Sequence, residues 1–459
     1  MANQRADVVV IGGGISGLSC AAFAHADGLD VRVLERSDTV GGVIRTMRED
    51  GYLSEDGPNS TLDGKPALAR LIALLNLSDH AIYANEEAKK RYVLRDGTLH
   101  ALPMSPPGLL SSKLFSFGGR LRALREPFIR RGGGNGESLA SFIERRFGRE
   151  ILDYAIDPFV SGVYAGDPSQ LGVQAAFGML VDYEREHGSV IRGAIRAAKE
   201  RKRAGGGRPQ MLSFDNGMDT LTGAIASQLG DSIVTGATCT GIERDPDGWR
   251  VHVVRDGTAE VSPCRAVVIA VPADAAAELL QPLDVEVASS LRDVPYAPIA
   301  SVFLGYARDR IVHPLDGFGF LVPSRERRDL LGVIFSSSLY PNRAPDGSVA
   351  ITAFAGGVRR SDIVDLDDES LVALVRRELN TRLGESGDPA VVRVRRWKRA
   401  IPQYAPGHER LDARVGELTR SHTGMYVCSN FCGGVSVADC IESGDVTATA
   451  IKSALTASV

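Results

Sequence analysis

The pattern of apolar and polar positions predicts a βαβ unit at the start of the chain. Residues 7–11 and 31–35 are apolar runs typical of buried parallel strands, and residues 18–27 have the apolar spacing of a helix. A glycine-rich segment, residues 12–17, joins the first strand to the helix. We therefore expect a parallel sheet to begin here.

The rest of the chain predicts a second sheet and a long helical stretch. Asp96-Gly97 is a turn signal and predicts a hairpin over residues 91–102. Residues 105–203 are mainly helix-like, whereas apolar runs between residues 300 and 357 are typical of an antiparallel sheet. Strands are expected at 233–242, 249–255, 266–271, 301–306, 318–322, 330–335, 350–355 and 425–428, and further helices at 67–77, 221–229, 370–383 and 437–455.

Composition excludes several classes of protein. The chain has 459 residues, which is too long for one ordinary domain because single cores stop growing near about 250–300 residues. Its hydrophobic content of 44% and charged content of 24% fit an ordinary folded protein. A formal net charge of −4 gives no overall attraction to nucleic acid, so we expect no nucleic-acid partner.

The cysteines and the N-terminal residues give an expectation for the cellular compartment of the protein. The six cysteines are scattered without CxxC pairs, which fits neither a disulfide scaffold nor a zinc ribbon, and we expect no metal site. The first residues lack a basic segment followed by a cleavable apolar stretch, and no run of about 18 apolar residues occurs. We expect a cytoplasmic protein, with peripheral contact to the inner face of the cell membrane left open.

The glycine-rich segment is the most specific local signal. Gly12 permits a tight turn, Gly14 lets the backbone approach a pyrophosphate, and Gly17 lets the helix pack closely on the strand. The amides at the start of the helix then face the phosphates. Glu35 ends the next strand, where an acid accepts both hydroxyls of an adenosine ribose. The combination predicts a dinucleotide site.

A second motif separates FAD from a nicotinamide dinucleotide. Glu35-Arg36 is followed by Gly41-Gly42 and Arg45-Thr46, and the second glycine pair again allows close backbone approach to a cofactor. The run over residues 33–46 resembles the extended FAD signature of the superfamily that contains monoamine oxidase, phytoene desaturase and protoporphyrinogen oxidase.

Further stretches resemble the protoporphyrinogen oxidases more than their superfamily relatives. They follow one another from end to end of the chain: Gly57-Pro58-Asn59-Ser60, Lys90-Arg91-Tyr92-Val93 and residues 161–168, 317–323, 401–408 and 433–441. On these motifs the chain is identified as a member of the protoporphyrinogen/coproporphyrinogen oxidase family.

The resemblance implies an α/β fold in which a Rossmann-type FAD-binding domain is interleaved with an antiparallel-sheet substrate domain and an inserted helical subdomain. The FAD-binding domain would comprise residues 1–85, 209–295 and 409–459. The substrate domain would comprise residues 86–104 and 296–408, and the helical subdomain residues 105–208.

The resemblance also implies which residues bind FAD. They are Gly12, Gly13, Gly14, Ile15, Ser16, Gly17, Glu35, Arg36, Gly41, Gly42, Val43, Gly57, Pro58, Asn59, Ser60, Cys239, Asn430, Val435, Ser436 and Val437. Relatives that tether flavin covalently use a cysteine ahead of the final motif, and residues 397–408 contain none, so we expect non-covalent FAD. Cys239 and Cys432 are interpreted as packing residues because no basic neighbour in sequence activates their thiols.

For the substrate the matching positions are Arg91, Gly162, Phe318, Gly319, Leu321 and Phe354. A porphyrinogen is a large apolar ring with carboxylate arms, so its site needs hydrophobic walls and a cation. Leu321 and Phe354 would sandwich a ring, Arg91 would bind a propionate, and the Gly162 carbonyl would face pyrrole N–H groups. No side chain is assigned as a catalyst, since the flavin N5 accepts the hydride.

The function implied by the resemblance is six-electron oxidation of protoporphyrinogen IX to protoporphyrin IX in haem biosynthesis, with O₂ as acceptor. Coproporphyrinogen III oxidation is an alternative. Two others are an FAD amine oxidase or carotenoid desaturase, and a non-catalytic FAD-binding scaffold. The motifs leave these open.

Residues 107–131 carry a second pattern, in which apolar residues such as Leu114, Phe117 and Phe128 alternate with Arg120 and Arg125. A basic amphipathic surface on anionic lipid has this pattern, and so does an ordinary helix pair over a core. Both interpretations stay open, as does a homodimer.

Overall fold

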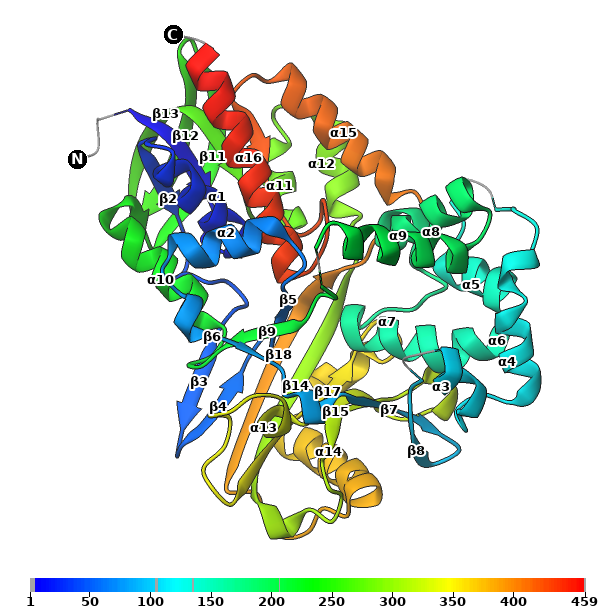
Figure 1. Ribbon diagram of the computed structural model, residues 1–459. Coiled ribbons are helices and arrows are strands. Elements are labelled where there is room, and N and C mark those ends of the chain that lie inside the picture. Colours follow the sequence, from blue (N-terminus) through cyan, green and yellow to red (C-terminus); the bar gives the residue numbers. More distant parts are fainter. Residues whose placement is uncertain (1–4, 104–105, 134–135, 206, 458–459) are drawn as a thin grey trace.

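The computed structural model describes residues 5–103, 106–133, 136–205 and 207–457 and has the predicted fold class, with two large sheets and a cluster of helices beside them (Figure 1). Where a predicted element or domain part includes residues 1–4, 104–105, 134–135, 206 or 458–459, that portion lies outside the described residues. The two ends of the described chain lie at the same end of the molecule (Figure 1).

The first sheet forms around the N-terminal strand. Its order is β10-β2-β1-β13-β12-β11, with β19 also paired to β13. β1 runs parallel to β2 and β13, and its residues Val8 to Val10 are fully buried because other elements cover both faces. The strands are β1 (Ala6–Ile11), β2 (Val31–Leu34), β10 (Ile233–Val234), β11 (Ala237–Asp245), β12 (Gly248–Arg255), β13 (Thr258–Ile269) and β19 (Met425–Val427).

The single strand predicted over residues 233–242 is wrong. Gly236 adopts a φ of +66° between β10 and β11, and its amide donates to the carbonyl of Ser37. β10 then pairs with β2 in parallel, whereas β11 pairs with β12 in antiparallel fashion. The break brings β11 next to the end of β2, where Glu35 lies.

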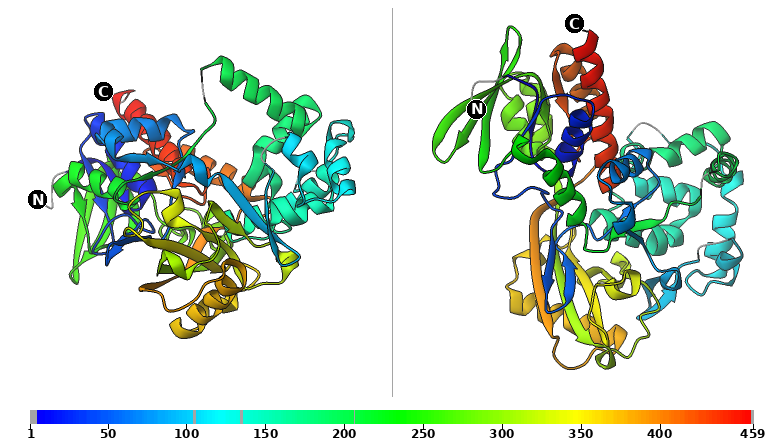
Figure 2. Two further views of the ribbon diagram at one scale, coloured as in Figure 1. Left: turned by 60° about the horizontal axis from the view of Figure 1, so that its bottom comes forward. Right: turned by 60° about the vertical axis from the view of Figure 1, so that its left-hand side comes forward.

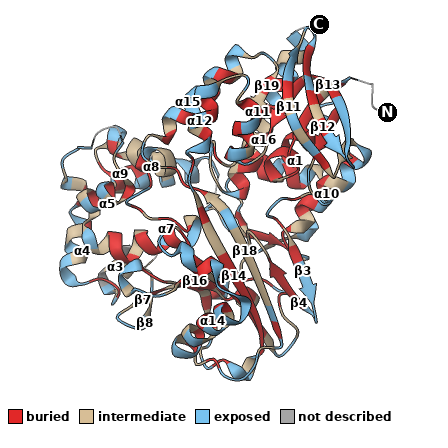
Figure 3. Ribbon diagram, turned by 180° about the vertical axis from the view of Figure 1, so that it is seen from behind, coloured by how far each residue is buried: buried red, intermediate tan, exposed pale blue. Residues whose placement is uncertain are grey.

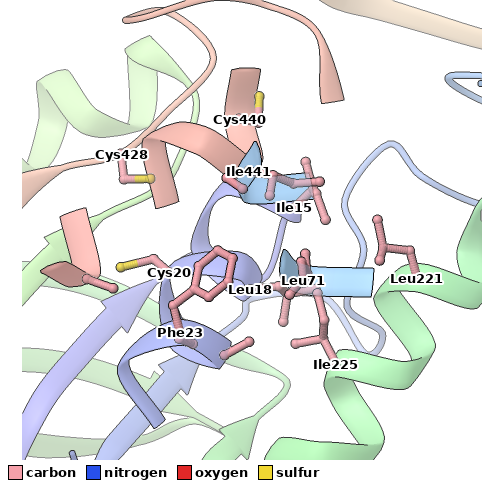
Figure 4. Close-up of a cluster of buried hydrophobic side chains, with 14 of the residues drawn as sticks. Ile15, Leu18, Cys20, Phe23, Leu71, Leu221, Ile225, Cys428, Cys440 and Ile441 are labelled. Carbon is pink, nitrogen blue, oxygen red and sulfur yellow. The ribbon is translucent and has the colours of Figure 1, made fainter. Parts of the chain in front are cut away.

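The helix after the glycine-rich segment is buried on most of its surface. Figure 4 shows Leu18 and Phe23 of this helix packed among Leu71, Ile225 and Ile441 from three other helices. A side chain at Gly444 would collide with Ser19, so the first and last helices touch. The helices on this side are α1 (Ile15–Ala26), α2 (Pro66–Leu74), α10 (Asp219–Leu229) and α16 (Val437–Ala457), and those on the opposite side are α11 (Ala273–Leu280), α12 (Val285–Arg292) and α15 (His408–Ser421).

The second sheet contains the predicted hairpin and the predicted strands between residues 300 and 357. Its order is β18-β14-β17-β16-β15-β7-β8. One face is fully buried against α14 (Asp368–Leu383). The strands are β7 (Lys90–Arg95), β8 (Thr98–Ala101), β14 (Tyr296–Ala307), β15 (Gly317–Leu321), β16 (Leu330–Ile334), β17 (Ser348–Gly356) and β18 (Val391–Pro402).

This sheet is antiparallel except at one contact. β7 pairs with β15 in parallel. The two strands are separated by the whole helical stretch and by part of the first sheet, so no tight turn imposes an antiparallel pairing. The parallel pairing places Arg91 opposite Gly319.

Two small sheets were not predicted. β3 (Thr46–Glu49) and β4 (Tyr52–Glu55) form a hairpin, and β5 (Thr61–Leu62), β9 (Met211–Phe214) and β6 (Ala81–Tyr83) form a short three-stranded sheet. Strands of two to four residues give no clear alternation in a sequence. In the sequence, the strands of both small sheets lie between strands of the two large sheets.

The helical stretch packs as a separate cluster to one side of both sheets (Figures 1 and 2). It has its own apolar core, which includes Phe142 and Val160, and a fully buried Arg146 paired with Glu126. Its elements are α3 (Pro106–Ser111), α4 (Phe117–Leu124), α5 (Leu139–Phe147), α6 (Arg149–Ile151), a π-helical turn (Leu152–Ile156), α7 (Asp157–Tyr164), α8 (Val173–His187) and α9 (Val190–Arg203).

Candidate flavin and substrate site

The glycine turn between β1 and α1 is crowded on the inside and open on the outside. Gly12 has a φ of +110°, and a side chain there would collide with the carbonyl of Ala270. A side chain at Gly17 would collide with the carbonyl of Gly12. At Gly14, by contrast, no heavy atom lies within 4 Å of the position of a Cβ. The open side at Gly14 therefore leaves the backbone accessible to a ligand.

The N-terminus of α1 opens onto the same place. Gly14 is its N-cap, no side chain caps it, and its first turn contains no acid. The first amides of a helix lack intrahelical acceptors and lie at the positive end of its dipole. This helix end is suited to bind a phosphate.

Glu35 and the second glycine pair lie against this turn. The Glu35 carboxylate accepts hydrogen bonds from the amides of Gly13 at 2.7 Å and Ser37 at 2.8 Å. The amide of Gly41 donates to the carbonyl of Gly13, and a Cβ at Gly42 would lie 3.3 Å from the Cα of Gly14. Two segments that are separate in sequence thus form one backbone surface.

The predicted residues 57–60 connect this surface to the second sheet. A side chain at Gly57 would collide with the carbonyl of Val43, whose own side chain is exposed. The side-chain amide of Asn59 donates to the carbonyl of Gly57 at 3.3 Å, and the indole of Trp397 on β18 donates to the carbonyl of Asp56 at 2.6 Å. This loop therefore links the glycine surface to the second sheet.

The C-terminal motif closes the same region. The Tyr404 hydroxyl donates to the carbonyl of Asn430 at 2.7 Å and accepts from the amide of Gly434 at 3.0 Å. Ser436 and Asp439 cap each other at the start of α16, so this helix end engages its own side chains while that of α1 remains uncapped. The role of Val435 to Val437 in binding flavin stays a prediction.

The two cysteines of this region do not have activated thiols. Burial raises the pKa of Cys239 to about 11, and burial together with Asp412 raises the pKa of Cys432 well above its usual range. A thiol with a raised pKa is a poor nucleophile at neutral pH. Their interpretation as packing residues agrees with these surroundings.

Four of the predicted substrate residues share one face of the second sheet. Arg91 pairs with Gly319, Leu321 pairs with Gly332, and Gly332 pairs with Phe354, and paired residues point to the same side of a sheet. We call this side, with Arg91, Gly319, Leu321 and Phe354, the Arg91 face. Leu321 and Phe354 are half-buried, in contrast with the fully covered residues of the opposite face.

Arg91 is a cation without a counter-ion. Its guanidinium lies 5.4 Å from the centre of the Phe318 ring. Burial lowers the pKa of Arg91, the nearby Arg208 lowers it further, and no carboxylate among the described residues opposes them. Phe318 lies beside Arg91, and the pair of arginines would favour an anionic ligand.

Gly162 approaches the Arg91 face from α7. A Cβ at Gly162 would lie 2.5 Å from Cδ2 of Leu321, so only glycine fits there without a shift. Gly162 lies in the last turn of α7, and the following amides of Ala165 and Gly166 both donate to Val160. The Gly162 carbonyl therefore has no helical partner in the described structure and is available to a donor.

Sequence reasoning missed Glu55, which is 5% exposed between the two sheets. Its carboxylate accepts from the Thr46 hydroxyl at 2.7 Å and the Met218 amide at 2.9 Å, and burial raises the pKa of Glu55 to about 7. A cavity of about 10 Å³ lies beside it, lined also by Asn59, Tyr340, Arg343 and Thr352. No spacing or motif in the sequence points to this group, because its partners come from three separate segments.

Comparison with known proteins agrees with this geometry. The profile of the flavin containing amine oxidoreductases matches residues 15–452, nearly the whole chain. The chain belongs to this family.

Two curated relatives show where the chain lies among flavin containing amine oxidoreductases. Protoporphyrinogen oxidase 1 of Arabidopsis thaliana chloroplasts is 36% identical over 96% of this chain and 87% of its own length. Coproporphyrinogen III oxidase of Bacillus subtilis is 28% identical over 99% of both chains. A crystal structure from Exiguobacterium sp. 255-15 has the same fold, with a TM-score of 0.82, 23% identity and coverage of 98% of this chain and 99% of that chain.

Membership of this family makes the chain a flavin-dependent oxidoreductase. The residues fit a flavin dinucleotide, because the open backbone at Gly14 and the uncapped end of α1 would take its diphosphate. Among the described residues, no group of three or more histidine, cysteine, aspartate or glutamate side chains gathers as a metal site.

Proposed function

We propose that the chain oxidises protoporphyrinogen IX to protoporphyrin IX with a non-covalently bound FAD. The observation that carries the proposal is Arg91, a half-buried cation with no carboxylate partner among the described residues. It lies on the sheet face whose residues Ile334 and Thr352 line one small cavity with Asn59 of the predicted flavin site. A ligand with carboxylates and a large apolar ring would satisfy both features. Relatives at 36% identity are named protoporphyrinogen oxidases.

The cofactor would be held by backbone groups and one carboxylate. Gly12 to Gly17 and the amides of α1 would bind the diphosphate, Glu35 the adenosine ribose, and Gly57 to Ser60 would adjoin the isoalloxazine ring. Non-covalent binding is supported by the absence of cysteine from residues 397–408 and by the high pKa of Cys432.

A bound flavin would supply two-electron redox chemistry, needed three times for each porphyrinogen, with O₂ as the acceptor and hydrogen peroxide as the by-product. The chain itself orients the substrate. Arg91 would bind a propionate, Leu321 and Phe354 would contact the ring, and the carbonyl of Gly162 would accept from pyrrole N–H groups. Lone pairs of the substrate nitrogens assist hydride loss, so the chain needs no general base.

A second candidate substrate is coproporphyrinogen III, which carries four propionates. It is favoured by the full-length similarity to the Bacillus subtilis enzyme and by Arg208, a second cation close to Arg91. Protoporphyrinogen IX remains the first choice because the relatives at about 35% identity carry that name.

A side-by-side turnover assay tests the proposal. Purified protein with FAD is given protoporphyrinogen IX or coproporphyrinogen III in air, and porphyrin fluorescence is followed. We expect the higher kcat/KM with protoporphyrinogen IX. A clear preference for the four-propionate substrate would replace the first choice, and no porphyrin from either substrate with turnover of amines would overturn the proposal.

We also propose that α4 and the turn after it lie on the inner face of the cell membrane. Phe117 and Phe128 are 76% and 82% exposed, and Leu121 and Leu124 are also exposed, on the outer side of the helical cluster. Leu114, by contrast, is fully buried in the core, so the predicted amphipathic surface is smaller than the sequence suggested. In the described part of the chain no helix is both long enough and apolar enough to span a bilayer.

A further inference from the structure

Arg359 links the two elements that carry the predicted substrate residues. It follows β17, the strand of Phe354, and its Nε donates to Oδ2 of Asp167 at 2.8 Å. Its Nη2 lies 2.7 Å from Oδ1 of Asp157, and its Nη1 donates weakly to the Ser161 hydroxyl at 3.5 Å. One guanidinium therefore contacts the chain before, within and after the segment that contains Gly162.

The two carboxylates bracket Gly162 in the sequence. Asp157 is the first residue of α7 and Asp167 follows its end, each about five residues from Gly162. Both are held by one cation, so neither end of α7 can move away from β17 without breaking an ion pair. The helix is thereby fixed along its whole length.

A second contact extends this link to β15. The other oxygen of Asp157 accepts from the amide of Ser324 at 2.7 Å, just after the strand that carries Leu321. The amide of Val358 donates to the carbonyl of Ala165 at 2.9 Å. The ends of both strands of the Arg91 face are thus bonded to the segment around Gly162.

Burial makes this network strong. The side chains of Asp157 and Asp167 are 7% and 17% exposed, so solvent screens their attraction to Arg359 only weakly. Burial alone would raise the pKa of Asp167, but Arg359 and Ser169 hold the pKa below its usual range. Removal of the arginine would leave two carboxylates without a counter-ion, which is more costly than loss of an exposed pair.

We propose that Arg359 is a positioning residue for the substrate, which fixes Gly162 and its carbonyl at their place against Leu321 of the Arg91 face. The inference rests on the proposed function, since the substrate is the molecule that would contact Gly162. Arg359 itself need not touch the substrate. A loosened α7 would weaken substrate binding and leave the flavin in place.

The test compares Arg359→Gln with Arg360→Gln. Arg360 is the matched control because it is the next residue and pairs with Asp329 and Asp362, neither of which lies in α7. Steady-state kinetics with protoporphyrinogen IX, flavin content and hydrogen exchange of residues 157–167 are measured for each. Arg359→Lys is added because it keeps the charge but loses the planar fork.

For Arg359→Gln we expect KM to rise about tenfold with kcat within about twofold, full flavin content and faster exchange over residues 157–167. Arg359→Lys should fall between this variant and the wild type, and Arg360→Gln should match the wild type. An unchanged KM despite faster exchange, or unchanged exchange, would overturn the inference. A uniform loss of kcat, flavin and thermal stability in both Arg359 variants would show a merely structural role and would also overturn it.

Failure of the proposed function can be distinguished from failure of the positioning role of Arg359. If the wild type produces porphyrin from neither porphyrinogen, the substrate assignment is wrong and the positioning role falls with it. The exchange measurement needs no substrate, so it still decides whether Arg359 holds α7.

Discussion

At the residue scale, two ionisable side chains, Arg91 and Glu55, have unusual surroundings. Arg91 lacks a carboxylate partner in the described structure, whereas its neighbour Lys90 is bonded to Asp316. Glu55 is a carboxyl group held in a buried site, where its neutral form is favoured. Single substitutions isolate the contribution of each group.

Replacement of Arg91 tests its role toward a carboxylate. Arg91→Met should raise KM for protoporphyrinogen IX roughly tenfold to hundredfold, because a charge-assisted hydrogen bond contributes about 1.5–3 kcal/mol. Flavin content should stay the same. Lys90→Met is the control, since Lys90 is adjacent in β7 and already engages Asp316. Equal effects of the two substitutions on KM would argue against a specific role of Arg91.

The raised pKa of Glu55 predicts that the stability of the folded state depends on pH. Burial raises the pKa of folded Glu55 from its ordinary value of 4.5 to about 7, so the folded state binds more protons and stability falls as pH rises between these values. Relative to Glu55→Gln, the wild type should lose about 3 kcal/mol of unfolding free energy between pH 4.5 and pH 8. Chemical denaturation of both proteins across this range measures the difference. A constant difference would show that Glu55 does not titrate there.

At the element scale, the sequence predicted the elements with a long periodic pattern and missed those held by remote contacts. The strand-turn-helix at residues 6–26 was predicted because its buried strand and glycine spacing are local. The break at Gly236 and the parallel pairing of β7 with β15 depend on strands far away in the sequence. The Asp157–Arg359 contact could not be predicted for the same reason.

The glycine turn gives a direct test at this scale. Gly14→Ala should fold normally, because the space around the new Cβ is open, but should lose FAD affinity because the methyl group would occupy the approach of the diphosphate. Gly223→Ala on α10 is the control, since its Cβ would also meet open space but far from this turn along the chain. Flavin absorbance after gel filtration and thermal unfolding are compared. Retention of FAD by Gly14→Ala would place the diphosphate elsewhere.

At the scale of the whole molecule, the two large sheets and the helical cluster are distinct parts, and the cluster has its own apolar core. Buried residues fill central strands of the two sheets, such as β1 and β14, and the view in Figure 3 shows exposed residues at the outer helices. The family membership was predicted from motifs spread along the chain, and the comparisons confirm it. The structure brings several of the predicted site residues together, and the assignment of all of them to a flavin or substrate site remains a proposal. Arg208 and Arg359 were missed because they lie outside any motif.

The exposed aromatic residues of the helical cluster predict membrane binding. Phe117→Ser with Phe128→Ser should weaken binding to vesicles that contain anionic lipid by about tenfold or more, because each buried phenylalanine contributes about 1.5–3 kcal/mol. Val312→Ser is the control, as Val312 is equally exposed at 82% but lies in the other part of the molecule. Co-sedimentation measures the bound fraction. If the double variant bound as well as the control, this surface would not be the contact.

The central claim is that a flavin in this chain takes electrons from a porphyrinogen. The most direct measurement is the absorbance spectrum of the FAD-loaded protein when protoporphyrinogen IX is added without oxygen. We predict that the flavin band bleaches when the porphyrinogen is added, because one flavin takes only the first two electrons, and that admitted air restores the band while porphyrin absorption appears. A flavin band that stays unchanged with porphyrinogen would contradict the account.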